Sequence, residues 1–122
     1  MAFKTRITDM LGIQHPIVQG GMQGVGTADM ASAVSNAGGL GIITALTQPS
    51  PAALREEIER CRSLTDKPFG VNLTVFPTIN SPDYNAYADA VVESGVRIME
   101  PAGPPAVREI WERVKPHGVT IL

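Results

Sequence analysis

The segment 18–26, VQGGMQGVG, places glycines and polar residues between an apolar run and a predicted helix. A glycine-rich loop of this kind can cradle a phosphate with its backbone N–H groups. The dinucleotide fingerprint needs G-x-G-x-x-G and an acidic residue about 20 positions later. Here the order from Gly21 is Gly21-x-x-Gly24-x-Gly26, no acid ends the next predicted strand, and no Gly-Lys-Ser or Gly-Lys-Thr follows. Two interpretations remain: glycines that only permit tight turning, or a strand-end loop that lets a flat ring approach the backbone.

Polar side chains occupy the ends of two other predicted strands. In the strand 69–76 the odd positions are apolar, whereas the even positions include Asn72 and Thr74. A barrel strand shows one face to the helices, and its inward face can carry polar groups for the active site near the carboxyl end. Glu100 ends the strand 96–100. It is either a catalytic carboxylate or a hydrogen-bonding group that orders the neighbouring loop.

The other reactive side chains indicate structural roles. His15 lies at the entrance of the first predicted strand, which is the end of a barrel away from the chemistry. His117 lies in a helix-ending turn and is expected to be solvated. Cys61 is expected to be a buried, inert thiol, and Trp111 is expected in the core. One cysteine and two distant histidines do not supply the three or four ligands of a metal site, so no metal is expected.

The apolar pattern predicts alternating strands and helices. Strands are expected at 15–21, 40–44, 69–76, 96–100 and 119–122, and helices at 27–39, 50–64, 81–95 and 104–118. The helix 50–64 has the clearest signals, because Ser50 can cap it and Pro51 suits its first position. Strands about 25 residues apart with helices between them predict a parallel sheet with crossover helices.

Residue spacing also predicts which helix faces are buried. The apolar faces are expected to be Met30, Ala33, Val34 and Ala37 in one helix and Val107, Ile110, Trp111 and Val114 in another. Thr27 is the expected N-cap of the first of these helices. Glu56 and Arg60 are spaced for an i,i+4 ion pair.

Two α/β architectures fit this order. Five strands can complete a small open, doubly wound parallel sheet, or they can form the first half, about four and a half βα units, of an eight-stranded barrel. The alternation in 69–76 favours the barrel, because a central strand of an open sheet is apolar on both faces. We treat residues 1–122 as part of a single domain.

Composition excludes several classes of function. The net charge is −2 and the ten basic residues are scattered, so we expect no nucleic-acid partner. The longest apolar run, GGLGIITAL, is too short to cross a bilayer, which needs about 20 residues, and the amino terminus does not resemble a secretory signal. A single cysteine allows no internal disulfide. These features predict a cytoplasmic protein without membrane contact.

Four segments in this order resemble one enzyme family. They are HPIVQGGMQ, SNAGGLGIITALTQPSP, RCRSLTDKPFGVNLTV and ESGVRIME. Together they resemble the amino-terminal half of the nitronate monooxygenases, formerly called 2-nitropropane dioxygenases. They are also similar to bacterial FMN-dependent NADH:quinone reductases of the same fold. The resemblance runs from about Thr5 to the last residue.

The resemblance implies a TIM barrel that binds FMN and oxidises alkyl nitronates with molecular oxygen. It implies that Gly21, Met22 and Gln23 lie against the flavin ring, that Thr74 contacts the flavin, and that Asn72 contributes from one inward position earlier. The stretch 18–26 would then face a flavin rather than bind a phosphate. The alternative activity is hydride transfer from NADH to a quinone on the same flavin.

The chain also departs from the family pattern. Relatives often carry a bulky residue in place of Gly24 and a threonine in place of Pro101. The family's phosphate loops, a lysine after strand five and the catalytic histidine after strand six would all lie beyond Leu122, so no catalytic residue is assigned here. A third expectation is therefore a non-catalytic half-barrel that associates with a copy of itself or with a missing half, because its sheet edges and inner face are uncovered.

Overall fold

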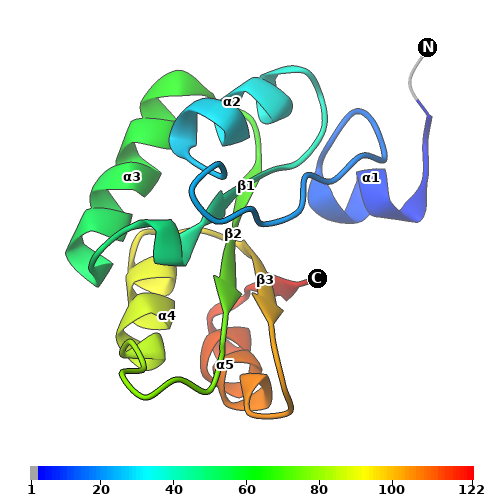
Figure 1. The fold of residues 1–122 in the computed structure, drawn as a ribbon. Coiled ribbons are helices and arrows are strands. Elements are labelled where there is room, and N and C mark those ends of the chain that lie inside the picture. The colour runs from blue at the N-terminus through cyan, green and yellow to red at the C-terminus, as the bar shows by residue number, and fades with distance from the viewer. Residues whose placement is uncertain (1–2) are drawn as a thin grey trace.

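The structure is a computed structural model and describes residues 3–122. Its elements are α1 (Arg6–Leu11), α2 (Ala28–Asn36), β1 (Gly41–Thr44), the 3₁₀ turn η1 (Ala45–Thr47), α3 (Pro51–Leu64), β2 (Phe69–Thr74), α4 (Tyr84–Glu93), β3 (Ile98–Ala102), α5 (Val107–Val114), η2 (Lys115–His117) and β4 (Thr120–Ile121). After α1 the chain alternates between helix and strand (Figure 1).

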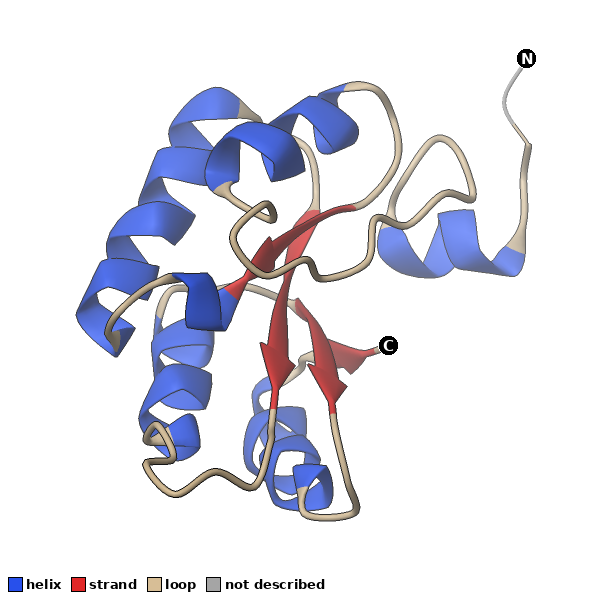
Figure 2. Ribbon diagram, in the orientation of Figure 1, coloured by secondary structure: helices blue, strands red, loops and turns tan. Residues whose placement is uncertain are grey.

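The four strands form one parallel sheet in the order β1-β2-β3-β4. A doubly wound sheet must reverse its strand order at a switch point, and this sheet does not. Crossovers of one hand between sequential strands place their helices on one face, and Figure 2 shows α3, α4 and α5 on the same side of the strands. This is the arrangement that a barrel requires.

The two faces of the sheet bury different groups of residues. Ile43, Val71 and Met99 pack with the helices in the main hydrophobic core. On the opposite face, a smaller core forms at the amino-terminal end of the strands from Leu11, Ile13, Leu40, Ile42 and Ile98. The chain around α1 thus closes one end of the inner face with apolar side chains.

The helix α1 was not expected from the sequence. Thr5 caps it, and the hydroxyls of Thr5 and Thr8 each accept the other's backbone N–H, at 3.2 and 2.8 Å. A capping box made by two threonines lacks the usual Glu or Gln at its third position, so the sequence gives little signal of it.

The predicted strand 15–21 is wrong in part. Val18 makes a single parallel bridge with Leu40. The side chains of Ile17 and Val18 are 62% and 42% exposed instead of buried. A strand is buried only where other elements cover its faces, and among residues 3–122 this segment has a strand on one side alone.

The predicted buried face of α2 is also wrong. The buried residues are Ala28, Ala31, Ser32 and Ser35 rather than Met30, Ala33, Val34 and Ala37. Close packing on β1 explains the choice of small side chains, because a Cβ added at Gly41 would lie 1.9 Å from the carbonyl oxygen of Ala31. Ser35 seals this contact by accepting the Gly41 N–H at 3.0 Å and donating to the carbonyl of Pro68 at 2.7 Å.

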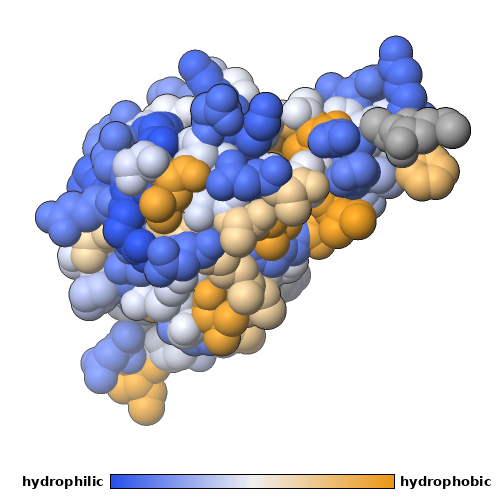
Figure 3. Space-filling model, turned by 90° about the horizontal axis from the view of Figure 1, so that it is seen from above, coloured by the Kyte–Doolittle hydropathy of each residue, from blue (hydrophilic) through white to orange (hydrophobic). Residues whose placement is uncertain are grey.

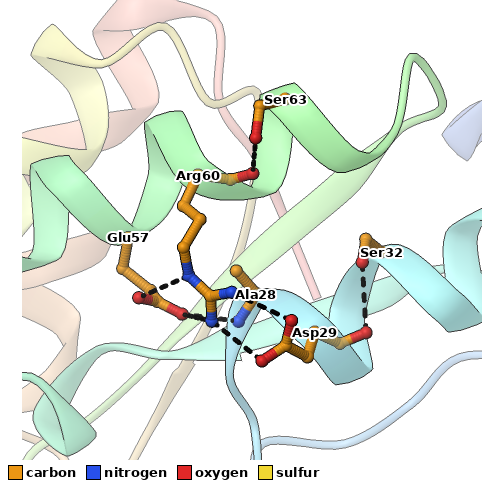
Figure 4. A network of polar contacts seen from close by, with 6 residues as sticks. All are labelled: Ala28, Asp29, Ser32, Glu57, Arg60 and Ser63. Carbon is orange, nitrogen blue, oxygen red and sulfur yellow. Dashed lines mark hydrogen bonds and ion pairs between the residues drawn. The ribbon is translucent and has the colours of Figure 1, made fainter.

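The start of α2 is tied to α3 by a charged network (Figure 4). Thr27 is the N-cap residue, as predicted, but its side chain makes no capping bond. Instead the Ala28 N–H donates to Glu57 Oε1 at 2.7 Å. Arg60 joins Glu57 and Asp29 at 3.0 and 2.9 Å, so the predicted pair of Arg60 with Glu56 is wrong. The Arg60 guanidinium holds the pKa of Asp29 below its usual value.

The other helices follow the sequence more closely. Ser50 accepts the Ala53 N–H at 3.1 Å and Pro51 opens α3, both as predicted. The predicted helix 81–95 begins later, because Asp83 caps α4 at Tyr84. In α5 Val107, Ile110 and Val114 are buried, but Trp111 is 39% exposed, so its expected core position is wrong. Within residues 3–122 no helix combines the length and apolar character needed to cross a membrane.

The close approach of α2 to β1 gives a test of this packing. In Gly41→Ala the new methyl group meets backbone atoms that cannot rotate away. We expect the free energy of unfolding to fall by about 3 kcal/mol, more than the roughly 0.5–1 kcal/mol that an alanine gains through the unfolded chain. Urea unfolding measures the loss. The matched control is Gly20→Ala, where no atom lies within 4 Å of the new Cβ, and equal stabilities of the two variants would contradict the packing described.

Candidate functional site

A row of polar residues crosses three strands on the face opposite the helices. The register pairs Thr44 with Asn72, and Asn72 with Glu100. Thr44 is the last residue of β1, Asn72 lies in the carboxyl-terminal half of β2, and Glu100 is the middle residue of β3. Their strand neighbours Ile43, Val71, Leu73 and Met99 belong to the core on the helix side. Thr44 and Asn72 are each only 4% exposed. Parallel strands in this register bring residues far apart in sequence into one layer, as in barrel enzymes.

The glycine-rich loop lies across this row and is held by hydrogen bonds from it. The Gly21 N–H donates to Glu100 Oε2 at 3.0 Å. The Met22 N–H donates to Thr44 Oγ1 at 2.8 Å, and the Thr44 hydroxyl donates to the Met22 carbonyl at 3.0 Å. Gln23 Nε2 donates to the Leu46 carbonyl at 3.1 Å. Glu100 therefore orders the neighbouring loop, which was one of its two predicted roles.

The backbone of this loop is directed inward. Five of the six N–H groups from Gly21 to Gly26 donate within the protein: those of Gly21, Met22, Gly24, Val25 and Gly26. A phosphate loop needs several N–H groups that point at the ligand. The loop therefore lacks the N–H donors that a phosphate site needs. The interpretation in which the loop faces a flat ring stays a prediction.

Glycine is needed here mainly for close approach. A Cβ added at Gly21 would lie 2.3 Å from Asn72 Cγ, and one added at Gly26 would lie 2.2 Å from Thr44 Oγ1. Gly24 is the one glycine of the loop in the left-handed region, with φ of 75°. Tight turning thus explains Gly24, whereas Gly21 and Gly26 let the loop lie directly on β1 and β2.

The Asn72 amide has one fixed orientation. Its Nδ2 donates to the Glu100 carbonyl at 3.1 Å, and its Oδ1 accepts the Thr74 hydroxyl at 3.3 Å. Among residues 3–122 no buried side-chain nitrogen or oxygen lacks a partner. The hydroxyl proton of Thr74 is directed at Asn72, so the lone pairs of Thr74 Oγ1 are what it offers to a neighbour.

A cavity of about 280 Å³ opens beside this row. It is lined by Gly21, Gln23, Thr44, Leu46, Asn72, Thr74 and Phe76. Four of the five residues that the sequence singled out lie in its wall. The fifth, Met22, is 37% exposed and joins the site through its backbone.

Sequence reasoning missed three residues of this wall. Phe76 is an even-numbered position of the predicted strand 69–76, so the rule of period two that identified Asn72 and Thr74 would have found it. Leu46 lies in the 3₁₀ turn η1, where that rule does not apply. Thr44 required the register between β1 and β2, which the sequence does not give.

The cavity wall is chemically suited to a flat, uncharged heteroaromatic group. Leu46 and Phe76 supply apolar surface, while Gln23, Asn72 and Thr74 supply neutral polar groups. No lysine or arginine lines it, so an attached phosphate would be bound by other residues.

The remaining candidates lie outside the cavity. The His15 backbone N–H donates to the Gly38 carbonyl at 2.8 Å, and the His117 carbonyl accepts from Arg97 at 2.8 Å. Cys61 is buried, and burial, with a smaller contribution from Glu57, raises the pKa of its thiol to about 11. Within residues 3–122 no group of three or more His, Cys, Asp or Glu residues is placed to hold a metal ion.

Comparison with known proteins identifies the family of this chain. Residues 4–121 match the family model of nitronate monooxygenase. The chain belongs to the nitronate monooxygenase family. A nitronate monooxygenase of Pseudomonas aeruginosa is 56% identical over 68 residues, which are 56% of this chain and 19% of that protein.

Other relatives match nearly the whole chain. The (3aS,4S,5R,7aS)-5-hydroxy-7a-methyl-1-oxo-octahydro-1H-indene-4-carboxyl-CoA dehydrogenase of Mycobacterium tuberculosis is 34% identical over 122 residues, 100% of this chain and 33% of that protein. The solved structure of FabK from Thermotoga maritima is 38% identical with a TM-score of 0.82, covering 98% of this chain and 36% of that one. The chain thus spans about a third of the length of the full-chain relatives. Its α/β fold is the first part of a TIM barrel, as predicted, and the doubly wound alternative is wrong.

The double hydrogen bond between Thr44 and Met22 gives a prediction about the loop. Thr44→Val keeps the shape of the side chain but leaves the Met22 N–H without its acceptor, while the Met22 carbonyl keeps the N–H groups of Val25 and Gly26. We expect a loss of about 2 kcal/mol in the free energy of unfolding and faster hydrogen exchange at the Met22 amide. Thr47→Val is the matched control, since it removes a single exposed bond, to the Gly24 N–H, and should cost less than about 1 kcal/mol. An unchanged Met22 exchange rate in Thr44→Val would show that this threonine does not hold the loop.

Proposed function

We propose that the whole protein to which these residues belong oxidises alkyl nitronates with molecular oxygen, using FMN. Family membership supports the reaction class, since the model matched by residues 4–121 is that of nitronate monooxygenase. The observation that carries the proposal is the cavity at the carboxyl ends of β1 and β2, with its neutral polar wall and the glycine-rich loop across it.

The residues present fit the ring system of FMN. Gly21, Gln23, Asn72 and Thr74 would face the ring, with Leu46 and Phe76 packing on its apolar part. When bound, the flavin would supply one-electron chemistry between the nitronate and oxygen. The role of this chain is to bind and orient the ring and to exclude water from its apolar side. The FMN phosphate would be held by residues beyond Leu122, since the glycine-rich loop has its N–H groups in use.

A second candidate is hydride transfer on the same flavin, from NADH to a quinone. One observation favours a dehydrogenase-type reaction: the Mycobacterium tuberculosis relative that matches all 122 residues is named as a dehydrogenase. Residues that would separate the two reactions lie mostly outside this chain.

We also propose a cytoplasmic location, on the basis of a single, buried cysteine and the absence from residues 3–122 of a helix able to cross a membrane.

A third candidate is a non-catalytic chain that binds a second copy or its missing half. Apolar residues reach the surface on the lobe that carries α1 (Figure 3), where Ile7 and Met10 are exposed. Ile17 and Val18 add apolar surface at the β1 edge of the sheet. Exposed apolar surface and open strand edges favour association.

An activity assay on the whole protein tests the proposal. We expect FMN in the purified protein and oxygen uptake driven by the nitronate of 2-nitropropane, at about 1 per second or faster. Quinone reduction with NADH, without nitronate-driven oxygen uptake, would establish the second candidate instead. For residues 1–122 alone we expect weak FMN binding and no turnover, and the mass in solution shows whether that chain self-associates.

Substitutions in the cavity test the flavin contacts. Thr74→Glu places a charged side chain in the cavity wall, where the ring would lie, and Met22→Glu places one on the loop that crosses the site. We expect the flavin content of the purified protein to fall at least about tenfold in each, because burying an unpaired charge is costly. Met10→Glu is the control, because Met10 is an exposed methionine outside the cavity. Unchanged flavin content in both Thr74→Glu and Met22→Glu would mean that the contacts are assigned to the wrong residues.

A further inference from the structure

We infer that Glu100 is a positioning residue that sets the geometry of the ring-facing surface without touching the ring itself. It does so by fixing both the glycine-rich loop and the Asn72 amide. The inference rests on the proposed function only in calling that surface ring-facing, because the positioning itself is a property of this chain.

Glu100 contacts both parts of the surface and lies outside the cavity wall. Its Oε2 accepts the Gly21 N–H at 3.0 Å across 79 residues of sequence. Its main-chain carbonyl accepts Asn72 Nδ2 at 3.1 Å. Since Gly21 and Asn72 both line the cavity and Glu100 does not, residue 100 acts on a ligand through these two neighbours, and the contact with Gly21 is the one that depends on its carboxylate.

The Gly21 peptide depends on this carboxylate. Thr44 holds the next residue, Met22, and Thr47 holds Gly24. On the other side, the Gly20 carbonyl accepts Gln19 Nε2 at 3.4 Å, and no atom lies within 4 Å of where a Gly20 Cβ would be. A carboxylate is a stronger acceptor for a backbone N–H than a neutral group. The hydrogen bond to Glu100 therefore holds Gly21 in contact with Asn72.

The second contact decides what the cavity offers to a ligand. With its Nδ2 directed at the Glu100 carbonyl, Asn72 turns its Oδ1 to the Thr74 hydroxyl. Thr74 then presents lone pairs to the cavity. Gln23 donates one of the two N–H groups of Nε2 to the Leu46 carbonyl and keeps its Oε1 as an acceptor. The wall thus offers acceptors at Thr74 and Gln23, which suit a ring that carries an N–H donor.

Glu100 acts here as a hydrogen-bond acceptor rather than as half of an ion pair. Within residues 3–122 no lysine, arginine or histidine nitrogen lies within 4 Å of its carboxylate. The amide oxygen of glutamine can take the same bond from Gly21. A positioning role therefore predicts that Glu100→Gln keeps the loop in place, whereas Glu100→Ala and the shorter Glu100→Asp release it.

Hydrogen exchange of the Gly21 amide, measured by NMR on this chain without flavin, tests the inference. We expect exchange at least about tenfold faster in Glu100→Ala, the loss expected for one bond to a charged group, and a smaller acceleration in Glu100→Asp. Glu100→Gln should keep most of the protection. Glu112→Gln removes an equal charge from an exposed position on α5 and should match the wild type. The Ala53 amide, bonded to Ser50, serves as an internal reference in every sample.

The outcomes separate this inference from the proposed function. Gly21 exchange that is the same in Glu100→Ala or Glu100→Asp as in the wild type overturns it, whatever the chain does with FMN. The expected order supports it, and the FMN dissociation constant, measured by flavin fluorescence on the whole protein, should then be about tenfold weaker for Glu100→Ala than for Glu100→Gln. If the exchange order holds but the whole protein binds no FMN, the positioning role stands and the proposed function fails.

Discussion

The parallel register of β1, β2 and β3 is the constraint on which the site depends. It places Thr44, Asn72 and Glu100 side by side, and each of them then holds a different part of the structure above the sheet. Thr44 and Glu100 fasten the glycine-rich loop, and Asn72 is the surface on which Gly21 lies. A shift of one residue in any strand would turn its polar side chain into the apolar core beneath the helices.

The same register divides the inner face of the sheet into an apolar layer that stabilises the strands and a polar layer that forms the site. At the amino-terminal end of the inner face, Ile42 and Ile98 pack with Leu11 and Ile13 from the chain around α1. Two residues further along each strand, the inner face becomes polar, with Thr44, Asn72 and Glu100. The apolar layer fixes the strands from one end, so that the polar layer at the other end can carry an open cavity. This division is the usual one in a barrel.

From α2 onwards the sequence was sufficient for the order of helices and strands, because each signal was local. Ser50 and Pro51 mark the start of α3, and alternation within β2 identifies Asn72 and Thr74 as inward residues. It was insufficient where distant segments decide the outcome. The buried face of α2 depends on the approach of Gly41, the partner of Arg60 depends on how α2 meets α3, and the exposure of Trp111 depends on which elements cover α5. Thr44 could not be assigned because strand register is a long-range property.

The glycine-rich loop shows why composition alone assigns such a segment poorly. Three glycines after a strand are compatible with a phosphate site, but a phosphate site needs N–H groups without protein partners. Here the N–H groups are bonded to Glu100, Thr44, Thr47 and the loop's own Met22 carbonyl, and two of the glycines serve to bring the backbone against β1 and β2. Because most of its donors are bonded within the protein, the loop has few N–H groups to offer a phosphate. The proposed contact with an aromatic ring would instead rely on shape and stacking area rather than on charge.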